Sequence, residues 1–200
     1  MGKKSLWSAL LIFTLIFFGT GCNDERATIK SPVFGNEDAS LKIALWFDFQ
    51  CPACRTYETS IMRFVMDDYV KTGKGVSMTY RNMAFLGKES ISAANAALCA
   101  HEQGRYKEYH DMVLEKQLGE NKGVFTDDLL ISLGKDLGLD IKNCVKAFKY
   151  RRQISAELKE AKDLGIRGTP ALFINGKLIN NPGSYLAMKQ LLDEELKKVK

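Results

Sequence analysis

The segment Phe47-Asp48-Phe49-Gln50-Cys51-Pro52-Ala53-Cys54 joins an apolar run of the chain to an amphipathic run. The preceding residues, Leu41 to Phe49, show little alternation, which is typical of a strand buried on both faces. Pro52 fits the first turn of a helix, because its missing N–H would be unpaired there. Beyond it, apolar residues return at helical spacing, at Tyr57, Ile61, Phe64, Val65 and Val70. The sequence therefore predicts a buried strand followed by a helix that begins with a Cys-x-x-Cys pair.

The two cysteines of this pair lie where a helix favours negative charge. Cys51 comes at the helix start, where unpaired N–H groups and the helix dipole stabilise a thiolate. Cys54 follows three positions later, so the pair can close as a disulfide or open as a dithiol. The thiolate is the form of cysteine that attacks disulfides. We interpret the pair as a redox site.

A Cys-x-x-Cys pair has two other common interpretations, a zinc site and an inert structural disulfide. A structural zinc site usually has a second close pair of ligands. Here Cys99 and Cys144 stand alone, and His101 and His110 have no ligand-like spacing to the pair. We therefore expect no metal and no cofactor. We place both histidines on the surface, or in satisfied positions on helices away from Cys51.

Length and charge restrict the class of protein. The 200 residues are enough for one domain, or for one domain with an insertion. The formal net charge is +5, and subtracting Lys3 and Lys4, which we expect to be removed, leaves +3. These charges are spread through segments of mixed sign without a basic stripe, so a nucleic-acid partner is not expected.

Residues 1–21 have the pattern of an export signal. Lys3-Lys4 precede an apolar stretch, Leu6 to Phe18, that is too short to span a bilayer comfortably. The small residues Gly19-Thr20-Gly21 then precede Cys22, an arrangement that resembles a bacterial lipoprotein signal. Gly19 departs from that pattern, which usually has Leu at this position, and an ordinary cleaved signal is the alternative. We expect lipidation at Cys22 and a protein outside the cytoplasm.

The cysteine count agrees with this assignment. If Cys22 carries lipid, four of the five cysteines remain, and they divide into the Cys-x-x-Cys pair and Cys99 with Cys144. We expect the latter two to form a structural disulfide, which an oxidising compartment permits. A bridge that closes about 46 residues contributes roughly 4 kcal/mol in the chain-entropy model. A second redox pair that relays electrons is the alternative.

The rest of the chain predicts an α/β domain at residues 39–200, preceded by a polar tether at 22–38. Removing a helical block at about residues 88–164 leaves the order β-α-β, then β-β-α, which is a thioredoxin fold. Asn175-Gly176 between two short apolar runs is a strong hairpin signal. The remaining predicted elements are strands at Val76–Arg81, Ala171–Ile174 and Lys177–Ile179 and a closing helix at Ser184–Val199.

From about residue 35 to 200, the chain resembles the DsbA-like branch of the thioredoxin-fold disulfide oxidoreductases. The resemblance depends on four blocks in a specific order: Trp46 to Cys54, Ala93 to Gly104, Gly165-Ile166-Arg167-Gly168-Thr169-Pro170, and Phe173-Ile174-Asn175-Gly176. It implies that Cys51 is the nucleophile and Cys54 the buried resolving thiol. It also implies that Pro170 is a cis proline that faces them, with the Thr169 backbone offered to an extended substrate peptide.

Two positions depart from the best-known member of this branch. Ala53 stands where that member has histidine, so Cys51 is expected to be less acidified and the protein less oxidising. Leu45 stands where it has an acid that assists proton transfer at the resolving cysteine. The nearest acid in the sequence is Asp48, which we interpret as a structural hydrogen-bond acceptor, with a proton relay as the alternative.

These observations predict an extracytoplasmic thiol–disulfide oxidoreductase, most simply a dithiol oxidase. Its expected partners are exported protein thiols and a membrane redox protein that recycles it, and we expect a monomer. A disulfide reductase of the same fold is one alternative. A Cu(I) carrier is the other, although the residues beside Cys51 and Cys54 supply no methionine or histidine ligand.

Overall fold

The computed structural model describes residues 28–199. The predicted export signal at residues 1–21 and the predicted lipidation site Cys22 lie outside the described residues. Across this described range, none of the helices has the length and apolar character needed to cross a bilayer.

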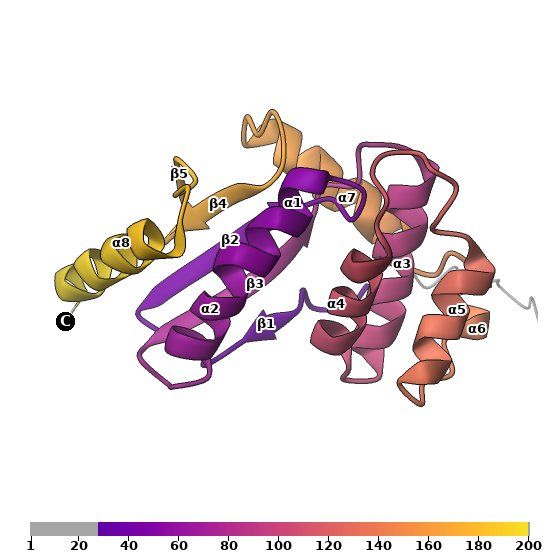
Figure 1. The fold of residues 1–200 in the computed structure, drawn as a ribbon, viewed down its shortest axis with the longest axis horizontal. Coiled ribbons are helices and arrows are strands. Elements are labelled where there is room, and N and C mark those ends of the chain that lie inside the picture. The colour runs from indigo at the N-terminus through magenta and orange to yellow at the C-terminus, as the bar shows by residue number, and fades with distance from the viewer. Residues whose placement is uncertain (1–27, 200) are drawn as a thin grey trace, which may run out of the picture.

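The centre of the fold is one five-stranded sheet in the order β1-β3-β2-β4-β5 (Figure 1). Strand β2 is parallel to β3, and the other neighbouring strands are antiparallel. β2 lies in the middle with neighbours on both sides, which accounts for its continuous apolar sequence. The strands are β1 (Val33–Phe34), β2 (Leu41–Phe47), β3 (Val76–Asn82), β4 (Ala171–Ile174) and β5 (Lys177–Ile179).

The hairpin between β4 and β5 follows the Asn-Gly prediction. Ile174 pairs with Lys177, so Asn175 and Gly176 form a two-residue loop. Both loop residues have positive φ, 46° and 78°, which is the conformation that this tight turn needs and that Asn and Gly tolerate.

The helix after β2 is continuous from Pro52 to Val70 but contains two wider turns. It runs through α1 (Pro52–Tyr57), the π-helical turn η1 (Glu58–Met62), α2 (Arg63–Val65) and the π-helical turn η2 (Met66–Val70). The other helices are α3 (Lys88–Glu102), α4 (Tyr106–Lys116), α5 (Asp127–Asp136), α6 (Lys142–Lys146), α7 (Arg151–Asp163) and α8 (Tyr185–Lys198).

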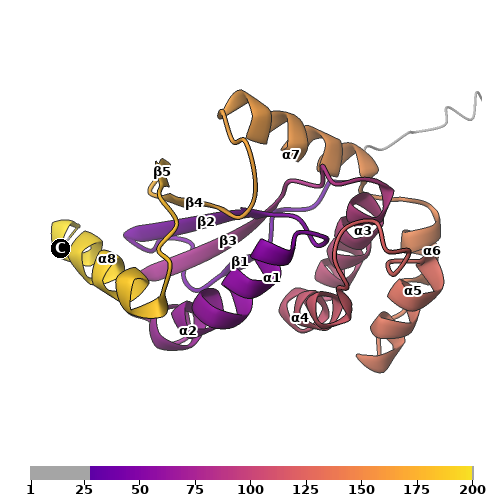
Figure 2. The same cartoon turned by 45° about the horizontal axis from the view of Figure 1, so that its top comes forward.

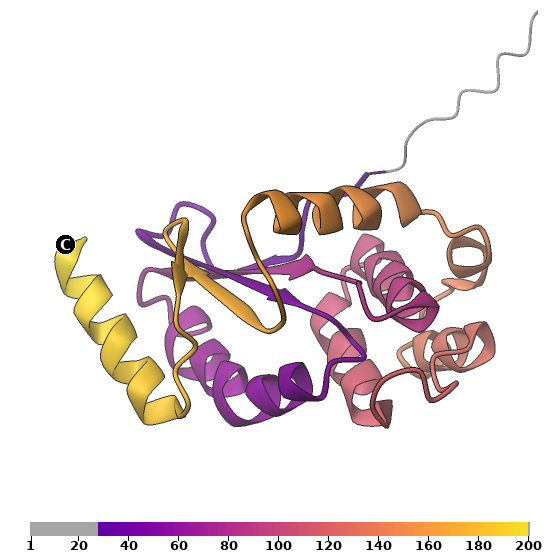
Figure 3. The same ribbon diagram turned by 90° about the horizontal axis from the view of Figure 1, so that it is seen from above.

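The helices form layers on the sheet. The helix from α1 to η2 covers one face, with α8 beside it, and α7 covers the opposite face (Figure 3). A small apolar cluster that includes Trp46 and Phe173 lies under α7, and the main core fills the space on the other side. The helices α3 to α6 pack at one end of the sheet, so the inserted block extends the domain sideways (Figure 2).

Helix α3 is the centre of the inserted block. Its alanines are all buried, and their small side chains let α4, α5, α6 and α7 pack around it. The alanine-rich composition of this segment therefore reflects packing on several sides at once.

Fold class and element order agree with the sequence prediction, and the predicted tether is the main difference. Within residues 22–38, Val33 and Phe34 form β1, which pairs with Thr79 and Met78 of β3. The ring of Phe34 packs edge-on against Tyr80 at 5.8 Å. This part of the chain joins the sheet edge instead of forming a linker. A two-residue strand is too short to show periodicity, so no local pattern predicts it.

Candidate active site

Cys51 and Cys54 lie at the start of α1, both as free thiols. Cys51 is the N-cap residue with extended backbone (φ −73°, ψ 114°), and Pro52 follows in the first turn. The residue Cys51 is 8% exposed and Cys54 is 4% exposed, so both are largely shielded from water. The chain thus presents a reduced pair at a helix N-terminus, at the edge of the main core.

The two thiols have opposite proton affinities. The pKa of Cys51 is lowered to about 6, first by a hydrogen bond from the Cys54 side chain and further by Thr169 and by the N–H groups of Cys54 and Ala53; burial opposes this shift. The pKa of Cys54 is raised, first by burial and then by the neighbouring Cys51. Near neutral pH this arrangement gives one thiolate and one thiol, which is the state needed for thiol–disulfide exchange.

Thr169 and Pro170 lie directly beside the pair. The bond between them is a cis peptide, and the Cys51 thiol donates a hydrogen bond to the Thr169 carbonyl at 3.3 Å. The hydroxyl oxygen of Thr169 is buried and has no hydrogen-bond partner among the described residues. The segment between α7 and β4 therefore brings residues more than 110 positions away in sequence into contact with Cys51.

The turn before Cys51 is held by the buried carboxylate of Asp48. One of its oxygens accepts from the Gln50 N–H (2.8 Å) and the Ser90 hydroxyl (2.6 Å). The other accepts from the N–H groups of Phe85 and Leu86, at 2.9 and 3.1 Å. Burial raises the Asp48 pKa, and these hydrogen bonds oppose the rise. With both oxygens occupied, the geometry supports the interpretation of Asp48 as a structural acceptor.

A second buried carboxylate, Glu58, was not singled out by the sequence. It lies one helical turn after Cys54 and is 4% exposed. One oxygen accepts from the Tyr80 hydroxyl at 2.6 Å and lies 3.2 Å from the Lys107 ammonium, which also contacts Asp111 at 2.6 Å. Ligand atoms of Glu58, His110 and Asp111 lie within 4.8 Å of one another, but Lys107 already supplies a cation that bridges the two carboxylates.

The two histidines differ in their surroundings. His110 is 1% exposed, and its ring lies within 5.4 Å of Phe49 and 4.7 Å of Tyr80. Its Nδ1 is 3.1 Å from an Asp111 oxygen, so it is a satisfied buried residue. It packs beneath the strand that leads to Cys51, which corrects the expectation that it lies away from that end. His101 is half-buried, with Nε2 2.9 Å from the Lys30 carbonyl.

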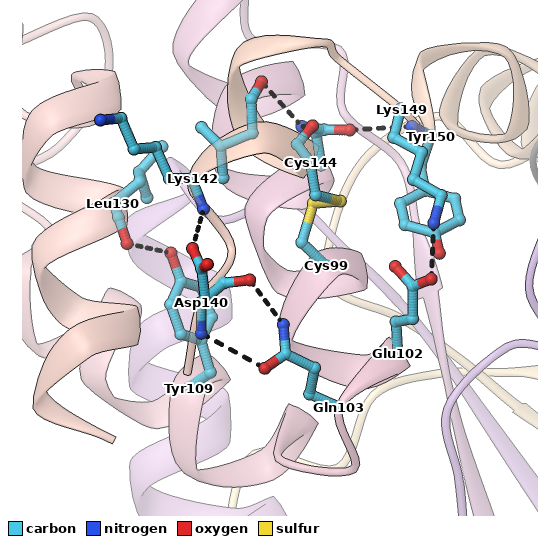
Figure 4. The surroundings of a disulfide bond; sticks show 12 residues. Cys99, Glu102, Gln103, Tyr109, Leu130, Asp140, Lys142, Cys144, Lys149 and Tyr150 are labelled. Atoms are coloured by element: carbon cyan, nitrogen blue, oxygen red, sulfur yellow. Dashed lines mark hydrogen bonds and ion pairs between the residues drawn. A yellow bond between two sulfur atoms is a disulfide. The ribbon is translucent and has the colours of Figure 1, made fainter. Parts of the chain in front are cut away.

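Cys99 and Cys144 form a disulfide that joins α3 to α6 within the inserted block. Their Cα atoms are 5.9 Å apart, and Cys99 is completely buried. Figure 4 shows the bridge flanked by hydrogen bonds between the same helices and loops, including Gln103 to Asp140. This pair is bonded to itself and is separate in the fold from the free thiols of α1.

Comparisons with known proteins agree with this geometry. A family model described as thioredoxin matches residues 27–194. A protein named probable disulfide bond formation protein D from Bacillus cereus is 29% identical over 183 residues, covering 88% of this chain and 83% of the relative. Disulfide bond formation protein D from Bacillus subtilis is 26% identical over 186 residues, covering 90% and 83%.

Solved structures show the same relationship. Oxidised BdbD from Bacillus subtilis superposes with a TM-score of 0.71 at 27% identity, covering 84% of this chain and 93% of that one. The α-DsbA1 protein of Wolbachia pipientis, at 17% identity, shares the fold with a TM-score of 0.75 over 86% of this chain and 94% of that one. The chain therefore belongs to the thioredoxin family, and within it the chain is a DsbA-like thiol–disulfide oxidoreductase.

Proposed function

We propose that the chain is a dithiol oxidase that acts outside the cytoplasm and transfers its Cys51–Cys54 disulfide to exported proteins. The main support is the contrast between a Cys51 pKa lowered to about 6 and a Cys54 pKa raised by burial. A thiol of low pKa leaves readily, and a stabilised thiolate favours the reduced form, which makes the disulfide an oxidant. The names of the Bacillus relatives support the same direction.

The reaction balances in two exchanges. A substrate thiolate attacks the sulfur of Cys51, the Cys51–Cys54 bond breaks, and Cys54 leaves and takes up a proton. A second substrate thiolate then attacks the substrate sulfur of the mixed disulfide and releases Cys51 as a thiolate. The substrate loses two electrons, which the chain gains as Cys51 thiolate and Cys54 thiol; of the two protons that the substrate thiols give up, one goes to Cys54 and the other to solvent. A membrane redox partner would then accept the two electrons and restore the disulfide.

The position of Thr169 and Pro170 supports an extended peptide as the substrate. The backbone of Thr169 lies beside the Cys51 sulfur, at 3.3 Å from the carbonyl oxygen. A substrate strand bound along this backbone would bring its cysteine to Cys51. Main-chain hydrogen bonds of this kind accept many sequences, which suits an enzyme that acts on unfolded exported chains as a monomer.

Lipidation of Cys22 is part of the proposal. The sequence pattern supports it, and the Cys99–Cys144 disulfide suits an oxidising compartment. Mass analysis of the mature protein from membranes should find an N-terminal peptide that begins with lipid-modified Cys22. Cys22→Ala should move the protein from the membrane to the soluble extracytoplasmic fraction. An unmodified N-terminus elsewhere would support the ordinary cleaved signal instead.

The reduction potential of the Cys51–Cys54 couple tests the direction of transfer. Equilibration with glutathione should give a value between those of DsbA and thioredoxin, roughly −120 and −270 mV. The oxidised chain should also convert a reduced, unfolded test protein to its disulfide form in a stoichiometric reaction. A potential near the thioredoxin value, together with rapid reduction of protein disulfides, would show a reductase.

A further inference from the structure

Just after α4, a polar side chain is buried and the apolar side chain next to it is exposed to solvent. Gln117 is 2% exposed, and its neighbour Leu118 is 72% exposed. A buried polar residue beside an exposed large apolar residue is the informative kind of exception to normal burial. It indicates that the position of Gln117 is fixed by what its amide contacts.

The Gln117 amide contacts the redox turn. Its Nε2 donates to the carbonyl of Phe49 at 2.6 Å and to the carbonyl of Cys51 at 3.1 Å. Its own backbone carbonyl accepts from a guanidinium nitrogen of Arg55 at 2.9 Å. One residue of the inserted block thus holds the strand end before Cys51 and the first turn of α1 after it.

A second contact fixes the same loop. The N–H of Asn121 donates to the side-chain oxygen of Gln50 at 2.6 Å, and the Gln50 amide donates to the Ser90 hydroxyl at 2.8 Å. The loop between α4 and α5 and the start of α3 therefore enclose residues 48–51 from both sides. The turn at residues 48–51 is therefore held partly by hydrogen bonds from the inserted helical block.

This arrangement matters for the thiolate because of the direction of nearby dipoles. The Cys51 carbonyl accepts the first N–H bond of α1, from Arg55 at 3.2 Å, while the N–H groups of Ala53 and Cys54 favour the charged sulfur. The Gln117 amide places the positive end of its dipole at that carbonyl. It thereby offsets negative potential close to the sulfur and keeps the N-cap geometry that aims the N–H groups.

We propose that Gln117 is a positioning residue for disulfide exchange, which holds the Cys51 turn from the inserted block and stabilises the Cys51 thiolate. This inference rests on the proposed function, because it concerns the same pair. If Gln117 has this role, the inserted helical block is part of the redox site. Removing the amide destabilises the thiolate, and so the reduced form, more than it destabilises the disulfide form.

The test compares Gln117→Leu and Gln117→Glu with the control Gln103→Leu in the full chain. Gln103 is also a glutamine of the block whose amide bonds to backbone, since it donates to the Asp140 carbonyl at 2.9 Å, but it does not contact the redox turn. Ultraviolet titration of the thiolate and equilibration with glutathione are measured for each. The first readout gives the pKa of Cys51, and the second gives the reduction potential of the Cys51–Cys54 couple. A loss of general stability changes neither value.

We expect Gln117→Leu to raise the Cys51 pKa by about one unit, as expected for loss of a charge-stabilising contact. At pH 7 this weakens the reduced form about fivefold, which corresponds to about 20 mV in a two-electron couple. Gln117→Glu should raise the pKa at least as much, because it replaces the donor with a negative group. Gln103→Leu should match the wild type in both readouts.

Equal pKa values and equal glutathione equilibria in the wild type, both Gln117 variants and the control would overturn the inference. If Gln117→Leu fails to fold, the nearly isosteric Gln117→Glu gives the same reading. A wild-type chain without exchange activity would instead contradict the proposed function. The pKa titration would still decide the role of Gln117 in that case.

Discussion

Cys51 and Cys99, one cysteine from each pair, lie at opposite ends of their helices, and the chemistry of the two pairs differs. Cys51 is at the N-terminus of α1, where backbone N–H groups favour a thiolate. Cys99 is in the last turn of α3, where the negative end of the helix dipole disfavours one. The first pair is open, and the second is closed as a disulfide.

Burial alone does not separate the two pairs. Cys51 and Cys54 are 8% and 4% exposed, whereas Cys99 is fully buried and Cys144 is half-buried, so the reactive pair is not the more exposed one. The open pair differs in having a peptide backbone, that of Thr169, within 3.3 Å of the reactive sulfur. Dipole direction and access by a substrate backbone therefore distinguish the reactive sulfur from the others.

The largest effect is expected at Cys51. Cys51→Ser should abolish disulfide transfer completely, because serine forms no mixed disulfide. Cys54→Ser should also lose disulfide transfer, but its Cys51 thiolate should attack a substrate disulfide and stay in the mixed disulfide, because the Cys54 thiol that would release it is missing. Gel analysis without reductant detects the trapped adduct, and circular dichroism checks that both variants fold. Residual turnover by folded Cys51→Ser would contradict the assignment.

The closed pair should affect stability more than activity. Replacing both Cys99 and Cys144 with alanine should lower the free energy of unfolding by about 4 kcal/mol. The melting temperature should fall by about 10 °C for a domain of this size. Calorimetry and an exchange assay at low temperature measure the two effects separately. A folded double variant without exchange activity would favour the electron relay.

Much of the fold was predictable because its signals are local. The apolar run of β2, the helical spacing after Pro52 and the Asn175-Gly176 turn each reflect short-range constraints. The pairing of Cys99 with Cys144 followed from counting. In the structure, α3 begins at Lys88 and α7 ends at Asp163.

The missed features depend on contacts between distant segments. Gln117 looks like an ordinary loop residue until the fold brings it to a carbonyl 66 residues earlier. Glu58 looks like an exposed helix residue, and only the fold shows that Tyr80 donates a hydrogen bond to it and that Lys107 pairs with its charge. β1 is visible only through its partner β3. A single sequence carries no local pattern for such pairings.

The pH dependence of labelling sharpens the contrast within the open pair. Alkylation of the reduced chain should label Cys51 first, with a rate that rises with pH to a plateau above a midpoint of about 6. Cys54 should stay unlabelled through pH 8, because burial raises its pKa. Mass mapping of labelled peptides measures both. Preferential labelling of Cys54 would reverse the roles.

The same pKa shift predicts a change in stability. The folded pKa of Cys51 lies below its unfolded value near 8.5, so the unfolded chain binds more protons between pH 6 and 8.5. The reduced chain should therefore gain stability as pH rises through that window and lose it as pH falls through 6. Urea unfolding at pH 6 and 8 measures the difference, with Cys51→Ala as a control that lacks it.

The smallest effect is expected at Ala53, an exposed position between the two thiols. A protonated imidazole there would attract the Cys51 thiolate, so Ala53→His should lower the Cys51 pKa and raise the reduction potential together. Each 30 mV corresponds to about 1.4 kcal/mol in this couple, and an exposed charge contact contributes at most about 1 kcal/mol, which limits the rise to about 20 mV. Ala53→Gln, which adds a neutral side chain, should change neither. High salt should reduce the histidine effect, because it screens exposed charges. A wild-type potential at or above roughly −120 mV would show that the missing imidazole does not limit the oxidising power of this pair.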